Sequence, residues 1–324
     1  MAKKVFITGI TGFVGSHLAE YILKDHPEYE IHGLIRWRSP MDNIEQIKDK
    51  VTLHCGDLRD QGSLYRILNK VKPEKIFHLA AQSYVPTSFD APVDTLTTNI
   101  IGTTNLLEAI RMLDLDCKIH ICSSSEVYGQ VTEEDVPINE DCPLRPASPY
   151  AVGKVGQDMI ALQYFLSYGI KTIRTRMFTH TGPRRGEVFV VSAFAKQIAL
   201  IEAGKQEPIL LVGNLDSIRT FADARDTVKA YWLLLEKCKP GEVYNIGGNV
   251  TATIKDMLRH LLDHCTTPIK VEVDPALLRP SDVTLQIPDC SKFILETGWS
   301  PEIPFETTMI DTLNYWRNKV YAYR

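Results

Sequence analysis

The sequence predicts an α/β protein built on a doubly wound parallel sheet, with a smaller α/β lobe on its C-terminal side. Two observations predict it. Short apolar segments alternate with amphipathic helical segments, a pattern typical of right-handed βαβ units. The glycine-rich segment Gly9-Ile-Thr-Gly12-Phe-Val-Gly15 joins the first apolar segment to the first helical one. Together they indicate a Rossmann-type fold.

The expected elements follow from the period of their apolar residues. Strands are expected at residues 4–8, 30–35, 51–53, 75–79, 118–123 and 171–176. Helices are expected at residues 14–24, 62–70, 92–113 and 150–168. We therefore expect one domain at residues 1–181, with segments near 214–235 returning to it, and a lobe made mainly of residues 182–324. Isolated strands at 209–212 and 242–246 are expected within that lobe.

Composition excludes several classes of protein. The chain has 324 residues and a formal net charge of -4, which gives no polycationic surface for nucleic acid. Its seven cysteines include no CxxC pair, which favours reduced thiols in the cytoplasm over a zinc site or a disulfide framework. No apolar run reaches the roughly 18 residues of a membrane span. The scattered cysteines also give no reason to expect a metal site. The N-terminal residues enter the first strand directly, so no signal peptide is expected.

The glycine segment favours a dinucleotide site. Glycine permits a tight turn there and lets a pyrophosphate approach the backbone amides at the helix start. A strand–helix turn without ligand is the alternative, and the βαβ context argues against it. The residues expected to line the cofactor here are Gly9, Thr11, Gly12, Phe13, Val14 and Gly15.

Two arginines follow the second expected strand, where NAD-selective sites usually carry an acid. Arg36 and Arg38 are suited to a 2′-phosphate, so we favour NADP over NAD, the alternative being a solvated basic loop. Further along the cofactor we expect contacts from Asp57, Leu58, Leu79, Ala80, Ala81 and Ser83.

A catalytic group is expected from Ser124, Glu126, Tyr150 and Lys154. Tyr150 and Lys154 are four residues apart, which places both side chains on one face of a helix, where the ammonium could lower the pKa of the phenol. Such a pair moves a proton at a carbinol oxygen while a nicotinamide exchanges hydride with its carbon, and Ser124 would share that oxygen. Tyr150 and Lys154 would also contact the cofactor.

Glu126 lies two residues after Ser124, so a continuing strand would aim both side chains the same way. Its carboxylate could remove the proton next to a new carbonyl, at sugar C5, before water is lost from C6. A structural acid paired with an arginine is the alternative. Tyr128 is a possible second acid, although a packing role is favoured for it.

The glycine segment, the Ser124, Tyr150 and Lys154 group and the motifs between them resemble those of the extended short-chain dehydrogenase/reductase family. The resemblance extends over nearly the whole chain. Residues 183–187 (PRRGE), 213–219 (GNLDSIR) and 279–283 (RPSDV) are similar to segments of the members that dehydrate GDP-mannose or reduce its 4-keto product. The resemblance implies a nucleotide-diphosphate sugar, most readily a GDP-hexose, as substrate, and a homodimer or homotetramer. It implies cofactor contacts for His180 and Arg185. It implies substrate contacts for Ser83, Ser124, Glu126, Arg184, Lys196, Arg219 and Arg279.

The chain departs from the dehydratase pattern in two places. Ser124 stands where dehydratases have Thr, and Thr179-His180-Thr181 stands where they have Asn-His-Glu. Residues 194–198 and 205–209 look more like the reductases. We favour the 4,6-dehydratase because Glu126 is present, with the NADPH-dependent 4-ketoreductase as the alternative. An epimerase, a decarboxylase, or a cofactor-binding regulator without catalysis is less consistent with these residues.

Overall fold

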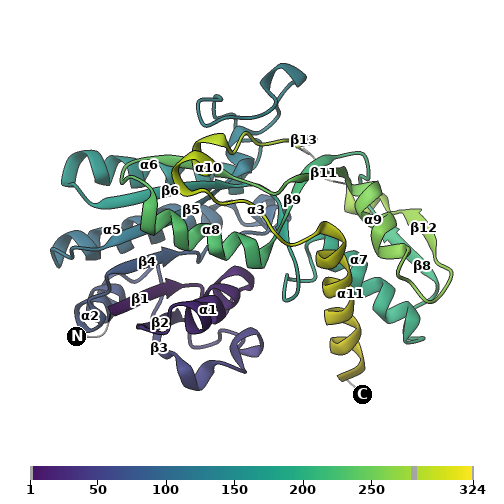
Figure 1. The fold of residues 1–324 in the computed structure, drawn as a ribbon, viewed down its shortest axis with the longest axis horizontal. Coiled ribbons are helices and arrows are strands. Elements are labelled where there is room, and N and C mark those ends of the chain that lie inside the picture. Colours follow the sequence, from purple (N-terminus) through teal and green to yellow (C-terminus); the bar gives the residue numbers. More distant parts are fainter. Residues whose placement is uncertain (1–2, 279–282, 323–324) are drawn as a thin grey trace.

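Seven parallel strands form the central sheet of the protein in a computed structural model, which describes residues 3–278 and 283–322 (Figure 1). Their order across the sheet is β10-β6-β5-β4-β1-β2-β3, so the chain winds outward in both directions from β1. This confirms the predicted fold class. The strands are β1 (Lys3–Thr8), β2 (Tyr29–Ile35), β3 (Thr52–Cys55), β4 (Lys75–His78), β5 (Lys118–Ser124), β6 (Lys171–Met177) and β10 (Val243–Ile246).

Helices cover both faces of this sheet, as its apolar strands require. One face carries α1 (Phe13–Asp25), α8 (Ala224–Lys237) and α10 (Ser291–Thr297), and the other carries α2 (Gln61–Val71), α4 (Pro92–Leu96), α5 (Gly102–Met112) and α6 (Pro149–Tyr168). The helix expected at 92–113 is continuous from α4 to α5 through a π-helical turn at Thr97–Ile101. The short α3 (Val85–Asp90) precedes it. Each face buries its own apolar core.

The smaller lobe lies beside the carboxyl ends of the strands (Figure 1). It combines α7 (Val190–Glu202), α9 (Ile254–Leu262) and α11 (Phe305–Ala322) around a third apolar core. Its strands are β7 (His180–Thr181), β8 (Ile209–Val212), β9 (Ile218–Asp223), β11 (Val250–Thr253), β12 (Lys270–Val273) and β13 (Leu285–Gln286), in one four-stranded and one two-stranded sheet. Across residues 3–278 and 283–322 no helix is long and apolar enough to cross a membrane.

One strand lies in a different sheet from the one expected. Residues 242–246 were expected in the lobe, but β10 pairs in parallel with β6 at the edge of the central sheet. Helix α8 packs against α1, which carries the chain back over the main domain before β10 begins. A short apolar strand has no local signal for which sheet it joins, because its own residues look the same in either.

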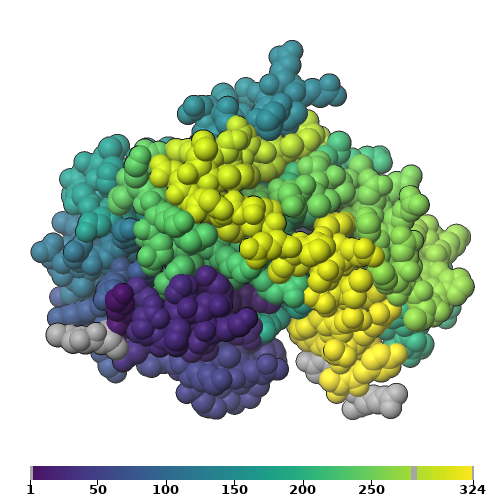
Figure 2. Space-filling model, viewed as in Figure 1, coloured from purple at the N-terminus to yellow at the C-terminus, as the bar shows by residue number. Residues whose placement is uncertain are grey.

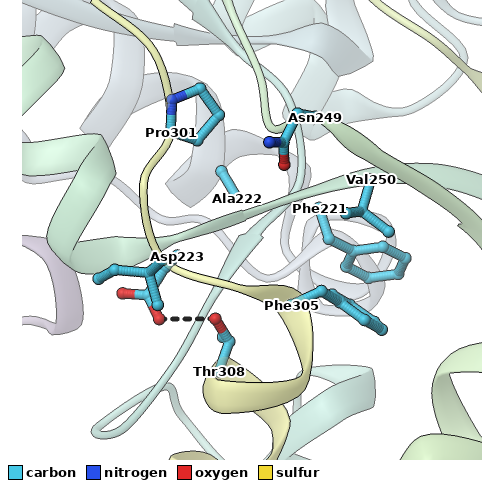
Figure 3. A pocket seen from close by; sticks show the side chains of 9 residues that line it. Phe221, Ala222, Asp223, Asn249, Val250, Pro301, Phe305 and Thr308 are labelled. Carbon is cyan, nitrogen blue, oxygen red and sulfur yellow. Dashed lines mark hydrogen bonds between the residues drawn. The ribbon is translucent and has the colours of Figure 1, made fainter.

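The two parts are joined by the segment between α10 and α11. Figure 2 shows this C-terminal segment, in yellow, crossing the surface from the main domain to the lobe. The backbone N–H groups of Glu302 and Ile303 donate to one carboxylate oxygen of Asp226, at 3.0 and 2.8 Å. Beside this crossing, the Thr308 hydroxyl donates to Asp223 at 2.8 Å, next to a cavity of about 10 Å³ (Figure 3). These bonds fix α11 against β9 and α8.

Candidate active site

The glycine turn after β1 brings backbone amides to the start of α1. Gly9 has a φ of 76°, and a β-carbon there would lie only 2.9 Å from the backbone nitrogen of Ala80. The N–H of Gly12 donates to the Gly9 carbonyl at 2.9 Å, and Gly12 leaves the helix start without a side-chain cap. A β-carbon on Gly15 would overlap the Gly9 carbonyl. These features fit a cradle for a dinucleotide pyrophosphate. Thr11, Phe13 and Val14 lie in the same turn and the first turn of α1.

The far end of this site carries exposed positive charge. Arg36 and Arg38 are exposed in the turn after β2, and the Arg38 guanidinium lies 4.1 Å from the centre of the Trp37 ring. Asp57 accepts hydrogen bonds from Arg59, which hold the pKa of its carboxyl below the ordinary value, with a smaller contribution from the Arg36 charge. Leu58 is buried in the core beside it.

The loop after β4, which holds Leu79, Ala80, Ala81 and Ser83, is held by a residue that sequence reasoning missed. Asn99 is fully buried in the π-helical turn. Its side-chain oxygen accepts from the backbone N–H of Gln82 at 2.9 Å, and its amide donates to the carbonyl of Gln82 at 3.0 Å. The π turn has no sequence signal that we can identify, so this contact needed the structure.

A cleft of about 600 Å³ opens where the lobe meets the main domain. This volume suits a ligand of nucleotide size. Seven of the site residues expected from the sequence line it: Ser83, Ser124, Glu126, Tyr150, His180, Arg185 and Arg219. The lining also includes residues that sequence reasoning missed, among them Tyr84, Phe189, Gln197, Asn214 and Gln286.

Tyr150 and Ser124 meet at the base of this cleft. Ser124 ends β5, and Tyr150 is the second residue of α6, whose start is fixed by Ser148 accepting from the backbone N–H of Ala151 at 3.1 Å. The Ser124 hydroxyl is close enough to the Tyr150 phenol to lower its pKa, and Ser124 Oγ also accepts from the backbone N–H of Glu126 at 3.2 Å. Ser124 and Tyr150 are at most 9% exposed. A substrate oxygen placed here would face both hydroxyls.

Lys154 lies one turn further along α6 and is buried. Its ammonium donates to the carbonyl of Cys122 at 2.7 Å and to the side-chain oxygen of Gln157 at 2.8 Å. The nitrogen lies 5.9 Å from the centre of the Tyr150 ring. Gln157 was not expected as a partner.

The pKa values differ from the expectation. Burial raises the pKa of the Tyr150 phenol, and the Ser124 hydroxyl only partly opposes this. Burial also lowers the pKa of the Lys154 ammonium. The pKa of the phenol is therefore raised where a lowering by Lys154 was expected, because desolvation is the largest effect.

Glu126 lines the cleft, but it is not placed there by a continuing strand, as was expected. Strand β5 ends at Ser124, and Glu126 lies in a 3-10 turn, Ser125–Tyr128. The argument from strand alternation is wrong, yet both side chains line the cleft. Tyr128, in the same 3-10 turn, is buried and does not line the cleft, and its hydroxyl donates to Asn245 at 2.7 Å. That contact agrees with the packing role favoured for Tyr128.

The basic residues of the second half lie in different places. Arg185 stacks 3.9 Å from the centre of the Phe189 ring, and burial lowers its pKa to about 10, so it stays a cation at neutral pH. His180 donates through Nδ1 to the carbonyl of Phe178 at 3.1 Å. Burial lowers its pKa to about 3, which leaves the ring neutral. Arg219 lines the cleft and donates to the carbonyl of Val283.

Two of the expected substrate contacts do not line the cleft. Arg184 is ion-paired with Glu20 on α1 at 2.7 Å, and Lys196 is ion-paired with Glu187 at 2.5 Å. Arg279 lies outside the described residues. Among residues 3–278 and 283–322, no three His, Cys, Asp or Glu side chains are grouped so that they could hold a metal ion.

Comparison with known proteins gives consistent results. A family model described as GDP-mannose 4,6 dehydratase matches residues 6–312. A GDP-mannose 4,6-dehydratase of Vibrio cholerae is 37% identical over 94% of this chain and 91% of its own length. A GDP-6-deoxy-D-mannose reductase of Pseudomonas aeruginosa is 32% identical over 99% of both chains.

Solved structures of similar proteins cover nearly the whole chain. RMD from Pseudomonas aeruginosa complexed with NADPH has a TM-score of 0.86 and 30% identity, covering 98% of this chain and 99% of the other. A dTDP-glucose 4,6-dehydratase of Bacillus anthracis in complex with NAD has a TM-score of 0.85 and 26% identity, covering 99% and 98%.

Proposed function

We propose, from the premise that the chain belongs to the GDP-mannose 4,6-dehydratase family of short-chain dehydrogenases/reductases, that its cleft converts GDP-mannose to GDP-4-keto-6-deoxymannose. The observation that carries the proposal is the meeting of Ser124, Tyr150 and Glu126 in one cleft. Oxidation at C4 alone needs only Ser124 and Tyr150. Loss of water across C5 and C6 needs a further acid/base group, and Glu126 supplies it.

Each residue has one task in this reaction. A bound nicotinamide cofactor would supply the hydride chemistry, with uptake from C4 and return to C6. Tyr150 takes the proton of the C4 hydroxyl as a phenolate, which is the minor form at neutral pH because burial raises its pKa. Ser124 donates a hydrogen bond to the same oxygen. Glu126 then removes the C5 proton, made acidic by the C4 carbonyl, and passes a proton to the departing C6 hydroxyl, which leaves as water. When the hydride reaches C6, C5 takes up one proton, and this balances the proton that Tyr150 received from the C4 hydroxyl. The sum is the loss of one water, with no net oxidation.

NADP is the cofactor that we propose, within the nicotinamide dinucleotides that the fold accommodates. Arg36 and Arg38 support it, because two exposed guanidinium groups after β2 suit a 2′-phosphate. Lys154 would hold the ribose, with Arg185 and His180 beside the nicotinamide half. Replacing Arg36 and Arg38 together with Ser should weaken NADPH binding at least tenfold more than NADH binding, measured by fluorescence titration. Equal losses for both would contradict the 2′-phosphate assignment.

The test of the activity itself needs no added cofactor. We would incubate the purified protein with GDP-mannose and follow the sugar by mass spectrometry, expecting the mass of one water to be lost over many turnovers per protein. Glu126→Gln should abolish that loss while NADPH binding and folding are kept. An unchanged sugar, also after addition of NADP, would contradict the dehydratase.

A 4-ketoreductase is the second candidate, since a reductase matches over 99% of both chains. It would consume NADPH with GDP-4-keto-6-deoxymannose and would not require Glu126. NADPH consumption that survives Glu126→Gln, in a protein inactive on GDP-mannose, would assign the reductase.

A homodimer, or a homotetramer built from it, is proposed as the assembly. Helices α4, α5 and α6 leave apolar side chains on the outer surface: Val93, Ile101, Met112, Val152, Met159 and Leu166 are 37–75% exposed. Such a face can pair across a two-fold axis as a four-helix bundle. We expect Leu166→Lys to shift the protein towards monomer in light-scattering measurements. We further propose residues 1–181, with α8, β10 and α10 packed against them, as the cofactor domain. Of the segment 214–235 that was expected to return to it, β9 lies in the sheet of the lobe. We also propose a cytoplasmic location, which suits the free cysteines seen throughout the described residues.

A further inference from the structure

The loop of residues 182–189, between β7 and α7, is tied to the cofactor-binding helix at two points. Arg184 donates from Nη2 to both carboxylate oxygens of Glu20, at 2.7 and 2.8 Å, and from Nη1 to the Ser16 hydroxyl at 3.4 Å. His17 donates from Nε2 to the carbonyl of Pro183 at 2.9 Å. We call residues 182–189 the strap. All of its partners on α1 lie within two turns of the glycine turn.

The strap turns sharply at Arg184, which has a φ of 71°. This left-handed conformation is strained for a residue other than glycine, so surrounding contacts must hold it. The turn directs two neighbouring guanidinium groups to different places. Arg184 reaches Glu20, while Arg185 lines the cleft, 5.1 Å from the centre of the Phe13 ring. The Phe13 ring also stacks on His180, with 5.8 Å between ring centres.

We propose that the Arg184–Glu20 pair holds the strap against α1 and thereby keeps the dinucleotide cofactor bound between the two hydride transfers. The inference rests on the proposed function. An enzyme that takes hydride from C4 and returns it to C6 must retain the reduced cofactor while water is lost. Arg185 and His180 flank Phe13, the first residue of α1, next to the amides of the glycine turn. His180 belongs to β7, so a strap that lifts away would remove Arg185 from this place and end its contact with His180.

Arg184 is accordingly a positioning residue and not the substrate ligand that the family resemblance implied. Its guanidinium is already matched to a carboxylate in the two-bond geometry that makes such pairs strong. Both side chains are partly exposed, at 20% and 31%, which limits the effect of the pair. Loss of the pair should therefore speed cofactor release by about twofold to fivefold.

The direct test is the rate of cofactor release without any sugar. Bound NADPH would be displaced by excess NADP in a stopped-flow instrument, with its fluorescence as the signal. Glu20→Gln and Arg184→Gln should each accelerate release, and the double variant should be no faster than the quicker single one. Exchanging the two charges, Glu20→Arg with Arg184→Glu, should restore part of the retention. Arg184→Gly relieves the strained φ, so it should fold at least as stably and still release NADPH faster.

A matched control breaks a similar pair elsewhere. Arg317 donates to both oxygens of Glu202 at 2.7 Å in the lobe, and Glu202→Gln should leave NADPH release unchanged. Release at the wild-type rate from all Glu20 and Arg184 variants would overturn the inference. So would a raised KM for GDP-mannose in Arg184→Gln at saturating NADP, with Glu20→Gln normal, because Arg184 would then bind the sugar nucleotide. If GDP-mannose is not dehydrated but Glu20→Gln still releases NADPH faster, only the proposed function fails.

Discussion

Replacing Asp158 with Asn should cost the protein much of its stability. Asp158 lies on α6 one turn beyond Lys154 and two turns beyond Tyr150, on the face that packs against the sheet. It is fully buried and accepts from Arg174 Nη1 at 2.7 Å and from Arg176 Nε at 2.9 Å. Both arginine side chains are only 5% exposed. The Asp158 carboxylate therefore partly neutralises two buried guanidinium charges. It also holds α6, the helix that carries Tyr150 and Lys154, against the sheet.

The expected loss in the free energy of unfolding depends on the hydrogen bonds that the two arginines keep. Removing one partner of a buried ion pair typically costs about 3–5 kcal/mol, because the remaining charge stays buried. Arg176 still donates to the carbonyl of Glu140 at 2.8 Å, and Arg174 to that of Gly241 at 2.8 Å. The asparagine oxygen can also accept one bond. We therefore expect about 3 kcal/mol, a large share of the roughly 5–15 kcal/mol that stabilises a typical domain.

Urea unfolding, followed by tryptophan fluorescence, would measure this loss. Glu45→Gln is the control, because it weakens an ion pair with Lys48 between two exposed side chains, where such pairs contribute less than about 1 kcal/mol. A free energy of unfolding within about 1 kcal/mol of wild type for Asp158→Asn, at an unchanged denaturant slope, would refute the reasoning.

Three further predictions concern the site and the junction of the two parts. Ser124→Ala should move the rising limb of the kcat/KM–pH profile to higher pH, because Ser124 lowers the pKa of Tyr150, whose phenolate is the base. A rising limb at the wild-type pH would contradict that role. Gln157→Met removes an acceptor of the Lys154 ammonium and should lower the free energy of unfolding by about 1.5–3 kcal/mol at neutral pH. Burial already lowers the Lys154 pKa, so urea unfolding should show this deficit shrinking as pH rises and the amine becomes neutral in both states. Thr308→Val should cost about 1–3 kcal/mol in thermal unfolding, since it leaves a buried carboxylate oxygen short of a donor (Figure 3).

Local patterns predicted the elements of the main domain because their physical causes are local. Glycine at position 9 is required by the turn itself, and the spacing of Tyr150 and Lys154 is a property of one helix. The pKa of Tyr150 was predicted in the wrong direction, since it depends on how much protein surrounds the phenol, and burial is a property of the whole fold. Asn99 and Gln157 escaped notice for a related reason. Neither belongs to a motif. Their contacts, with the backbone N–H of Gln82 and with the ammonium of Lys154, are known only once the chain is folded.

The neighbouring residues Arg184 and Arg185 show where sequence reasoning ends. They have the same chemistry and share one motif, so resemblance placed both at the ligands. In the structure only Arg185 lines the cleft, while Arg184 meets Glu20, 164 residues earlier in the chain. No pattern within the motif separates the two, because the difference is set by a carboxylate on α1 and by one left-handed backbone angle. A motif thus indicates which chemistry a segment brings, and the distant partner decides which of its residues binds the ligand and which holds the segment in place.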